Sequence, residues 1–259
     1  MKIRNVNLYN YVFIYTSNCE LILFNAGEKV LIPFNTIAIL EKNITFDVEC
    51  VRLGNGILYQ HFELDDSTLL SLRSIYEPLI KIDAEYLTKK RGFTEMVFKV
   101  KTDDTLINLF GKLINSYHSD ISRMYKIAYL TSKCEDATKL AMSLYRTAAI
   151  SCKEKIAREL ATDISKKWKL SDLAEAFHVS EISIRKKLES EGVNFNQLLL
   201  DVRMNHAAKL IVRSNKQINM IANSVGYTSI SYFIKVFKDY YGITPKQFEI
   251  ALKENLTSK

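Results

Sequence analysis

The feature that most constrains the fold is a twenty-residue stretch near the carboxyl end, residues 226–245. The glycine at its start predicts a turn, because glycine adopts positive φ without strain, and Ser229 is a typical helix N-cap. The helix that follows carries Phe233 and Phe237 on one face, four residues apart. Gly242 predicts a left-handed cap for this helix, and the closing proline opens another helix. The stretch therefore predicts the second half of a helix-turn-helix unit.

A weaker copy of this pattern occupies residues 170–188, and its expected N-cap, Ser180, precedes Ser229 by 49 residues. Leu173 and Leu188 supply its apolar face. In a helix-turn-helix, exposed residues near the start of the second helix contact base edges. The residues that the two copies place there, with their caps, are the candidate DNA contacts: Ser180, Ile182, Arg185, Lys186, Ser229, Ser231, Tyr232 and Lys235.

Residues 195–214, between the two copies, predict one long helix. Twenty residues of α-helix span about 30 Å, and successive major grooves on one face of DNA are roughly 34 Å apart. One chain can therefore place both second helices in adjacent grooves. The alternative is a set of amphipathic helices with no DNA role.

Charge is unevenly distributed between the two halves of the chain. Residues 151–259 hold 18 Lys and Arg against 12 Asp and Glu, whereas residues 1–150 hold 18 against 17. A basic half beside a nearly neutral half suggests that one domain meets a polyanion and the other does not. Solvated helix faces are often basic, so the charge supports nucleic acid only in combination with the motif.

Composition argues against several kinds of site and location. There is no run of eighteen apolar residues and no apolar signal-peptide core, so we expect a cytoplasmic protein without a membrane span. Four cysteines without CxxC spacing and four scattered histidines predict neither a metal nor another cofactor. Phosphate-binding glycine loops and nucleophile elbows are missing, so we expect no enzyme.

The first 150 residues change from strand-like to helix-like spacing near residue 65. Apolar and aromatic segments separated by turn signals predict strands over 9–24, 30–40, 43–53 and 57–64. Helical patterns follow over 65–78, 103–114, 125–130 and 137–150. We therefore expect an α+β domain, with a small sheet or barrel followed by helices.

The rest of the chain is helical by pattern, with helices expected over 153–165, 170–177, 180–190, 195–214, 218–225, 229–241 and 245–254. The change falls near 145–155, so residues 1–150 form one expected domain and residues 151–259 an all-α domain with two helix-turn-helix units. A Pro-, Gly- or Ser-rich linker does not mark the boundary, which favours a tight junction.

Residues 226–245 resemble the C-terminal signature of the AraC/XylS family of bacterial transcription regulators. Arg203-Met204 followed by Ala207, Leu210 and Ile211 is similar to the linker helix of that family. The resemblance implies a cupin-like β-barrel before the helices, and sequence-specific binding to promoter DNA beside RNA polymerase. The chain departs from the family pattern at three positions: Lys186 and Glu249 replace the usual Arg, and Leu188 replaces the usual Phe.

Residues 15–19, 39–44, 195–197 and 244–248 resemble the subgroup from enteric pathogens that controls virulence genes. This implies an activator modulated by dimerisation through the N-terminal helices, or by an effector such as a fatty acid or bicarbonate. Some relatives hold a fatty acid between the two domains, with basic residues on its carboxylate and apolar residues along its tail. The candidate ligand contacts are Tyr9, Tyr11, Phe13, Ile22, Phe24, Lys29, Phe62, Arg213 and Lys216.

A second interpretation is a protein–protein regulator that sequesters a partner without reading bases. The basic residues expected to point outward, Arg185, Lys186 and Lys235, favour DNA binding. A gel-shift titration at two salt concentrations would separate these interpretations.

Overall fold

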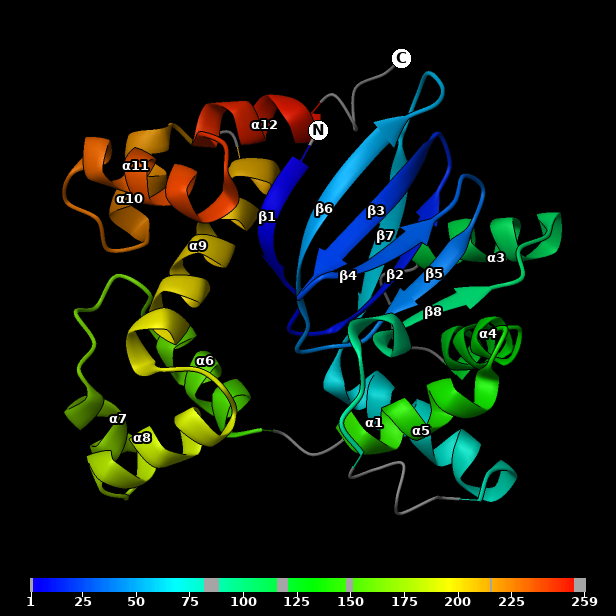
Figure 1. Cartoon of the computed structure of the whole chain (residues 1–259), viewed down its shortest axis with the longest axis horizontal. Helices are drawn as coiled ribbons and strands as arrows, with labels where there is room; N and C mark the ends of the chain where they lie inside the picture. Colours follow the sequence, from blue (N-terminus) through cyan, green and yellow to red (C-terminus); the bar gives the residue numbers. More distant parts are fainter. Residues whose placement is uncertain (1, 82–88, 116–120, 148–150, 215, 254–259) are drawn as a thin grey trace. The chain divides into compact units, whose positions relative to one another are not determined.

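The computed structural model describes residues 2–81, 89–115, 121–147, 151–214 and 216–253 (Figure 1). The described residues separate into two compact units, residues 2–147 and residues 151–253. The first unit is α+β and the second is all-α, which confirms the expected fold classes. Part of the expected boundary, residues 148–150, lies outside the described residues, so the tight junction there stays a prediction; the final residue of the last expected helix, 254, also lies outside them.

The first unit contains two antiparallel sheets of four strands each. In spatial order, one sheet consists of β1 (Lys2–Asn7), β6 (Thr45–Arg52), β3 (Cys19–Asn25) and β4 (Glu28–Ile32). The other consists of β7 (Tyr59–Leu64), β2 (Tyr11–Thr16), β5 (Ile37–Leu40) and β8 (Val97–Val100).

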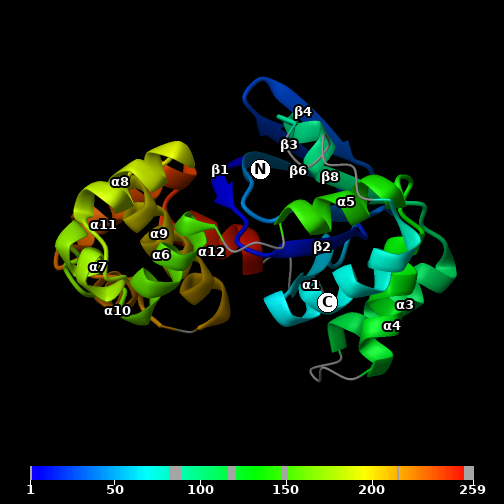
Figure 2. The same ribbon diagram turned by 90° about the horizontal axis from the view of Figure 1, so that it is seen from below.

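Alternation along the strands sorts the apolar side chains of the first unit into two cores. One core lies between the sheets and includes Leu21, Leu23 and Phe46. The other lies on the opposite face of the β2 sheet, where Phe13 and Phe62 pack against helices. Those helices are α1 (Asp66–Tyr76), α3 (Asp104–Asn115), α4 (Ile121–Ser132) and α5 (Ala137–Thr147), and the 3-10 turn η1 (Glu77–Leu79) follows α1. A second 3-10 turn, η2 (Phe93–Met96), precedes β8 and contributes Phe93 to the core between the sheets. Figure 2 shows α1, α3 and α4 on the other side of β2 from β3 and β4.

The strands differ from the sequence expectations in two respects. The sequence pattern does not indicate β1, which is largely polar, or β8, which has only four residues. The strand expected over 9–24 is interrupted at Ser17 and Asn18, whose side chains both donate hydrogen bonds to the Ile57 carbonyl. The strand expected over 30–40 is interrupted at Asn35, whose φ of 55° lies in the left-handed region.

The second unit contains seven helices among its described residues. They are α6 (Cys152–Thr162), α7 (Leu170–Ala176), α8 (Glu181–Ser190), α9 (Phe195–Arg213), α10 (Ile218–Ser224), α11 (Ile230–Tyr241) and α12 (Pro245–Lys253). They confirm the two expected helix-turn-helix units, α7–α8 and α10–α11. None of the described helices of the chain is both long enough and apolar enough to cross a bilayer.

The turns of the two helix-turn-helix units differ in the residue that adopts positive φ. Gly226 forms the turn of α10–α11 with φ 86°, and Gly242 ends α11 with φ 82°, so both expected glycine roles are confirmed. In the turn of α7–α8 the corresponding residue is His178, with φ 54°. Histidine stands there in place of glycine, so the first helix-turn-helix unit lacks the glycine that marks this turn in the second, although a side chain in the left-handed region is less favourable than glycine.

Candidate nucleic-acid interface

The first candidate recognition helix, α8, begins with the side chains that the sequence assigned to DNA. The hydroxyl of Ser180 accepts a hydrogen bond from the Ser183 amide at 3.2 Å, which confirms this serine as the N-cap. Ile182 is 66% exposed, and Arg185 and Lys186 are also exposed. The opposite face of α8 is held in the core by two buried residues, Ile184 and Leu188.

The second candidate recognition helix, α11, repeats this arrangement. Its N-cap is Ser229, whose hydroxyl accepts a hydrogen bond from the Tyr232 amide at 3.3 Å. Tyr232 is 60% exposed, and Ser231 and Lys235 are also exposed. On the buried face, the rings of Phe233 and Phe237 pack with their centroids 5.8 Å apart. Packing therefore turns the polar face of α11 toward solvent.

The connecting helix α9 has 19 residues, which corresponds to about 28 Å of α-helix. A buried acid fixes α11 to it: Asp201 accepts hydrogen bonds from the Tyr240 hydroxyl at 2.7 Å and from the side-chain amide of Gln197 at 2.8 Å. The hydroxyl of Tyr241 also donates to the side chain of Asn205 at 3.3 Å. Sequence reasoning missed these groups; the available signal was a polar residue on the apolar face of a long helix.

The carboxyl end of α8 is fixed to the start of α6. The carboxylate of Glu191 accepts hydrogen bonds from the backbone amides of Cys152 and Lys153, at 2.9 and 2.8 Å. An acid at a helix N-terminus is favourable, because it satisfies free amides and complements the helix dipole. The link orients α8 relative to α6.

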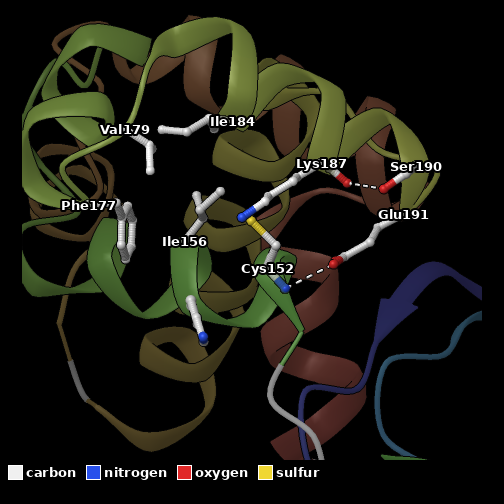
Figure 3. Close-up of a pocket in the computed structure, with 9 residues that line it drawn as sticks. Cys152, Ile156, Phe177, Val179, Ile184, Lys187, Ser190 and Glu191 are labelled. Atoms are coloured by element: carbon white, nitrogen blue, oxygen red, sulfur yellow. Dashed lines mark hydrogen bonds between the residues drawn. The ribbon is translucent and has the colours of Figure 1, made fainter.

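A pocket of about 440 Å³ lies between α6 and α8 (Figure 3). Its lining combines apolar and charged side chains: Cys152, Lys155, Ile156, Phe177, Val179, Ile184, Lys187, Ser190 and Glu191. Figure 3 shows the side chains of Cys152 and Lys187 extending toward each other across it. None of the candidate DNA contacts lines this pocket.

The candidate ligand contacts of the N-terminal domain fall into separate places. Tyr11, Phe13 and Phe62 belong to the core between the β2 sheet and the helices, where the rings of Phe13 and Phe62 stack at 4.8 Å. Ile22 and Phe24 alternate with buried neighbours on β3, so they lie on the outer face of the other sheet. The structure therefore does not bring these apolar residues together around one cavity.

The remaining candidates are polar or basic. Lys29 is exposed, with its ammonium 5.9 Å from the centroid of the Phe24 ring. Tyr9 is half-buried in the loop between β1 and β2. Arg213 and Lys216 are exposed residues of the second unit, at and just beyond the end of α9. Ligand contact by any of these residues stays a prediction.

Tyr11 takes part in a buried polar cluster that the sequence patterns do not indicate. Its hydroxyl lies 2.6 Å from that of Ser143 and 2.8 Å from that of Thr147, and burial raises its pKa. Ser143 donates in turn to the carboxylate of Glu41 at 2.5 Å, and that carboxylate pairs with Arg91 at 2.6 Å. The cluster joins β2, the segment after β5 and α5, which gives Tyr11 a structural role.

Within the described residues, no three His, Cys, Asp or Glu side chains gather in a way that could hold a metal ion. The arrangement that the structure does provide is two exposed helix starts with basic side chains and serine caps, carried on one rigid connecting helix. Such helix starts contact base edges and phosphates in proteins that bind DNA through helix-turn-helix units.

Comparison with known proteins gives the family. A family model for a helix-turn-helix domain matches residues 173–249. The chain is 52% identical to the HTH-type transcriptional activator FapR of Escherichia coli, over 99% of this chain and 98% of FapR. It is 35% identical to the virulence regulon transcriptional activator VirF of Shigella flexneri, over 96% of this chain and 95% of VirF.

Solved structures of ToxT from Vibrio cholerae share the two-domain fold. One has a TM-score of 0.73 with 22% identity, over 96% of this chain and 93% of ToxT. Another, which contains a bound unsaturated fatty acid, has a TM-score of 0.68 with 20% identity, over 96% and 90% of the two chains. Sequestering a protein partner without reading bases is not favoured, because the relatives are named as transcriptional activators. The chain belongs to the AraC/XylS family of DNA-binding transcription regulators, as the resemblance implied.

Proposed function

We propose that this regulator activates virulence genes by placing α8 and α11 in successive major grooves of promoter DNA. The observation that carries the proposal is the pair of exposed, serine-capped helices joined by the 19-residue helix α9. FapR and VirF are named as transcriptional activators, and VirF is named for a virulence regulon. Activation implies that the bound regulator meets RNA polymerase, in the cytoplasm where promoter DNA lies.

The exposed side chains of the two helices have different proposed roles. Arg185 reads a base, because a guanidinium can donate two hydrogen bonds to guanine in the major groove. Lys186 and Lys235 contact phosphates as point charges. Ile182 contacts the methyl group of a thymine. The other proposed contacts are the polar residues at the helix starts: Ser180, Ser229, Ser231 and Tyr232.

The test starts from duplexes that the full chain selects from a random library. Arg185→Ala should weaken binding to the selected site by about 1–3 kcal/mol, without lowering the melting temperature. Lys101→Ala is the charge-matched control, because it removes one positive charge from an exposed residue of the N-terminal compact unit, which contains neither recognition helix. Wild-type binding should weaken steeply with salt as phosphate contacts release counterions. Equal binding to all duplexes, or affinity that does not change with salt, would refute the proposal.

Dimerisation through the N-terminal helices is proposed on the exposed face of α4. Ile121, Tyr125 and Tyr129 recur at every fourth residue and are 77%, 66% and 47% exposed. Apolar residues at this spacing form one stripe on a helix, a form suited to packing against a second copy. Tyr125→Glu should convert a dimer to a monomer in sedimentation equilibrium, whereas the control Thr138→Glu on α5 should not. A monomeric wild-type chain would refute the dimer.

We also propose that residues 1–150 sense a fatty acid or bicarbonate. The ToxT structure with an unsaturated fatty acid has the same fold, and this motivates the choice of the first ligand. A ligand changes the DNA-competent population only by its differential affinity for the two states. DNA binding by the full chain should therefore change when an unsaturated fatty acid or bicarbonate is added. If neither ligand has an effect, dimerisation becomes the better account of this domain.

A further inference from the structure

Arg203, near the middle of α9, contacts the segment where the first helix-turn-helix unit begins. Its Nε–H donates a hydrogen bond to the carbonyl oxygen of Ile164 at 3.3 Å, and its Nη2–H donates to that of Lys166 at 2.9 Å. Both carbonyls belong to the loop between α6 and α7. The guanidinium therefore fixes this loop to the connecting helix through two different residues.

The loop that Arg203 holds is itself well fixed. One carboxylate oxygen of Asp163 accepts hydrogen bonds from the backbone amides of Ser165 and Lys166, both at 3.2 Å. The indole of Trp168 donates to the Asp163 carbonyl at 2.8 Å, and Trp168 is buried. A contact at this loop therefore acts on the position of α7, which follows the loop directly. Through α7 it acts on the whole first helix-turn-helix unit, α7–α8.

The same guanidinium also faces the second helix-turn-helix unit, α10–α11. Its central carbon lies 5.7 Å from the centroid of the Tyr227 ring. That ring packs on α11, at 5.5 Å from Phe233 and 6.0 Å from Tyr232. Tyr227 thus connects Arg203 to the core and to the exposed start of the second recognition helix.

The turn of the second helix-turn-helix unit approaches the loop between α6 and α7 beside Arg203, at Gly226. A Cβ atom at Gly226 would lie 2.9 Å from Arg203 Nη2 and 2.9 Å from the Ser165 carbonyl oxygen. The positive φ of the turn and this close approach both require glycine. The turn of the second helix-turn-helix unit and the loop between α6 and α7 are therefore both packed against the Arg203 side chain.

We propose that Arg203 is a positioning residue that fixes the separation of the two recognition helices, and so the half-site spacing that the regulator accepts. A guanidinium suits this role because its edge donates in several directions while its face lies on an aromatic ring. A lysine ammonium would keep the charge but lose the planar fork. The inference rests on the proposed function, because spacing matters only if both helices bind DNA together.

The experiment uses the full chain and a bipartite duplex selected by the wild-type protein from a random library. Derived duplexes carry one base pair more or fewer between the half-sites, which shifts one half-site by about 3.4 Å and turns it by about 35°. Two further duplexes each have one half-site scrambled. The variants are Arg203→Ala, Arg203→Lys, Tyr227→Leu and, as the control that removes a charge from the same helix, Lys209→Ala. The fluorescence of Trp168, the single tryptophan, and the melting temperature report on the loop and on folding.

The wild-type chain and Lys209→Ala should bind the altered spacings roughly tenfold more weakly than the selected one. Arg203→Ala and Arg203→Lys should each lose most of this discrimination, while their affinity for the scrambled duplexes matches that of wild type. Tyr227→Leu should reduce discrimination too, and combining it with Arg203→Ala should add little.

The outcomes separate the inference from the function on which it rests. Wild-type discrimination in a folded Arg203→Ala variant would overturn the positioning role alone. If Arg203→Ala unfolds, full discrimination in a folded Arg203→Lys variant would overturn the role of the fork. If the wild-type chain selects no bipartite site, two-helix binding fails, and the positioning role fails with it.

Discussion

Ile182 is the exposed apolar residue for which we propose a contact with thymine. It is 66% exposed at the start of α8, whereas Ile184 two residues later is buried. Removing the exposed apolar surface of this isoleucine from water is favourable. Its position three residues before Arg185 therefore suits contact with an apolar group on DNA. The C5-methyl of thymine is the apolar group that the major groove presents.

Replacing thymine by uracil in the selected site removes that methyl group and leaves base pairing intact. We expect the wild-type chain to bind the uracil duplex more weakly, by about 0.8 kcal/mol, which is the value of burying one apolar carbon. Ile182→Ala should bind both duplexes equally, and gel-shift titration gives both ratios. A thymine preference that survives in Ile182→Ala would assign the methyl contact to another residue.

Phe233 and Lys235, two residues apart on α11, should fail in different ways when each is changed to alanine. Phe233 is fully buried, so Phe233→Ala should destabilise the domain by about 3–5 kcal/mol and lose DNA binding through unfolding. Lys235 is exposed, so Lys235→Ala should change stability by less than about 0.5 kcal/mol but weaken DNA binding. Urea denaturation followed by circular dichroism separates the two effects. Comparable stability losses in both variants would contradict the assigned faces of α11.

At the scale of elements, Cys19 on β3 and Cys50 on β6 interact across paired strands. A hydrogen bond from the Cys19 thiol lowers the pKa of Cys50 to about 7, although burial opposes this shift. Because the thiolate is the nucleophile, alkylation of Cys50 should increase with pH through about 7. In Cys19→Ala the midpoint should rise toward the ordinary value of about 8.5. Mass spectrometry after iodoacetamide pulses measures both midpoints, and equal midpoints would contradict the hydrogen bond.

Elements with strong local signals could be predicted from the sequence. Ser180, Ser229 and Gly242 act at helix ends through their own conformation and hydrogen bonds, so the sequence is enough to place them. The exposed positions of Arg185 and Lys235 followed from the same periodicity. Their contacts with DNA stay predictions, because neighbours on a helix do not reveal which base a side chain meets.

Groups whose role depends on distant partners could not be predicted. The hydroxyl of Tyr11 forms a hydrogen bond with Ser143, which is 132 residues away in the sequence. Asp201 on α9 accepts a hydrogen bond from Tyr240 on α11. For the candidate ligand contacts, the sequence showed many aromatic residues but not which face of its sheet each one occupies. Side chains alternate between the two faces along a strand, so a shift of one residue reverses the face. Phe13 lies on the helix-covered face of the β2 sheet and Phe24 on the outer face of the other sheet, so the two do not meet.

At the scale of the whole molecule, the question is whether both recognition helices bind one DNA molecule at the same time. For duplex DNA, the logarithm of affinity falls with the logarithm of salt by about 0.9 for each neutralised phosphate. Lys186→Ala on α8 and Lys235→Ala on α11 should each reduce the steepness of this slope by about 0.9. The double variant should reduce it by about 1.8, because each lysine neutralises its own phosphate in the same complex. Filter-binding titrations of the full chain across several salt concentrations measure the slopes, and Ile182→Ala, which changes no charge, should keep the wild-type slope. If only one helix were engaged in the complex, one of the two single variants would keep the wild-type slope, and the double variant would match the other.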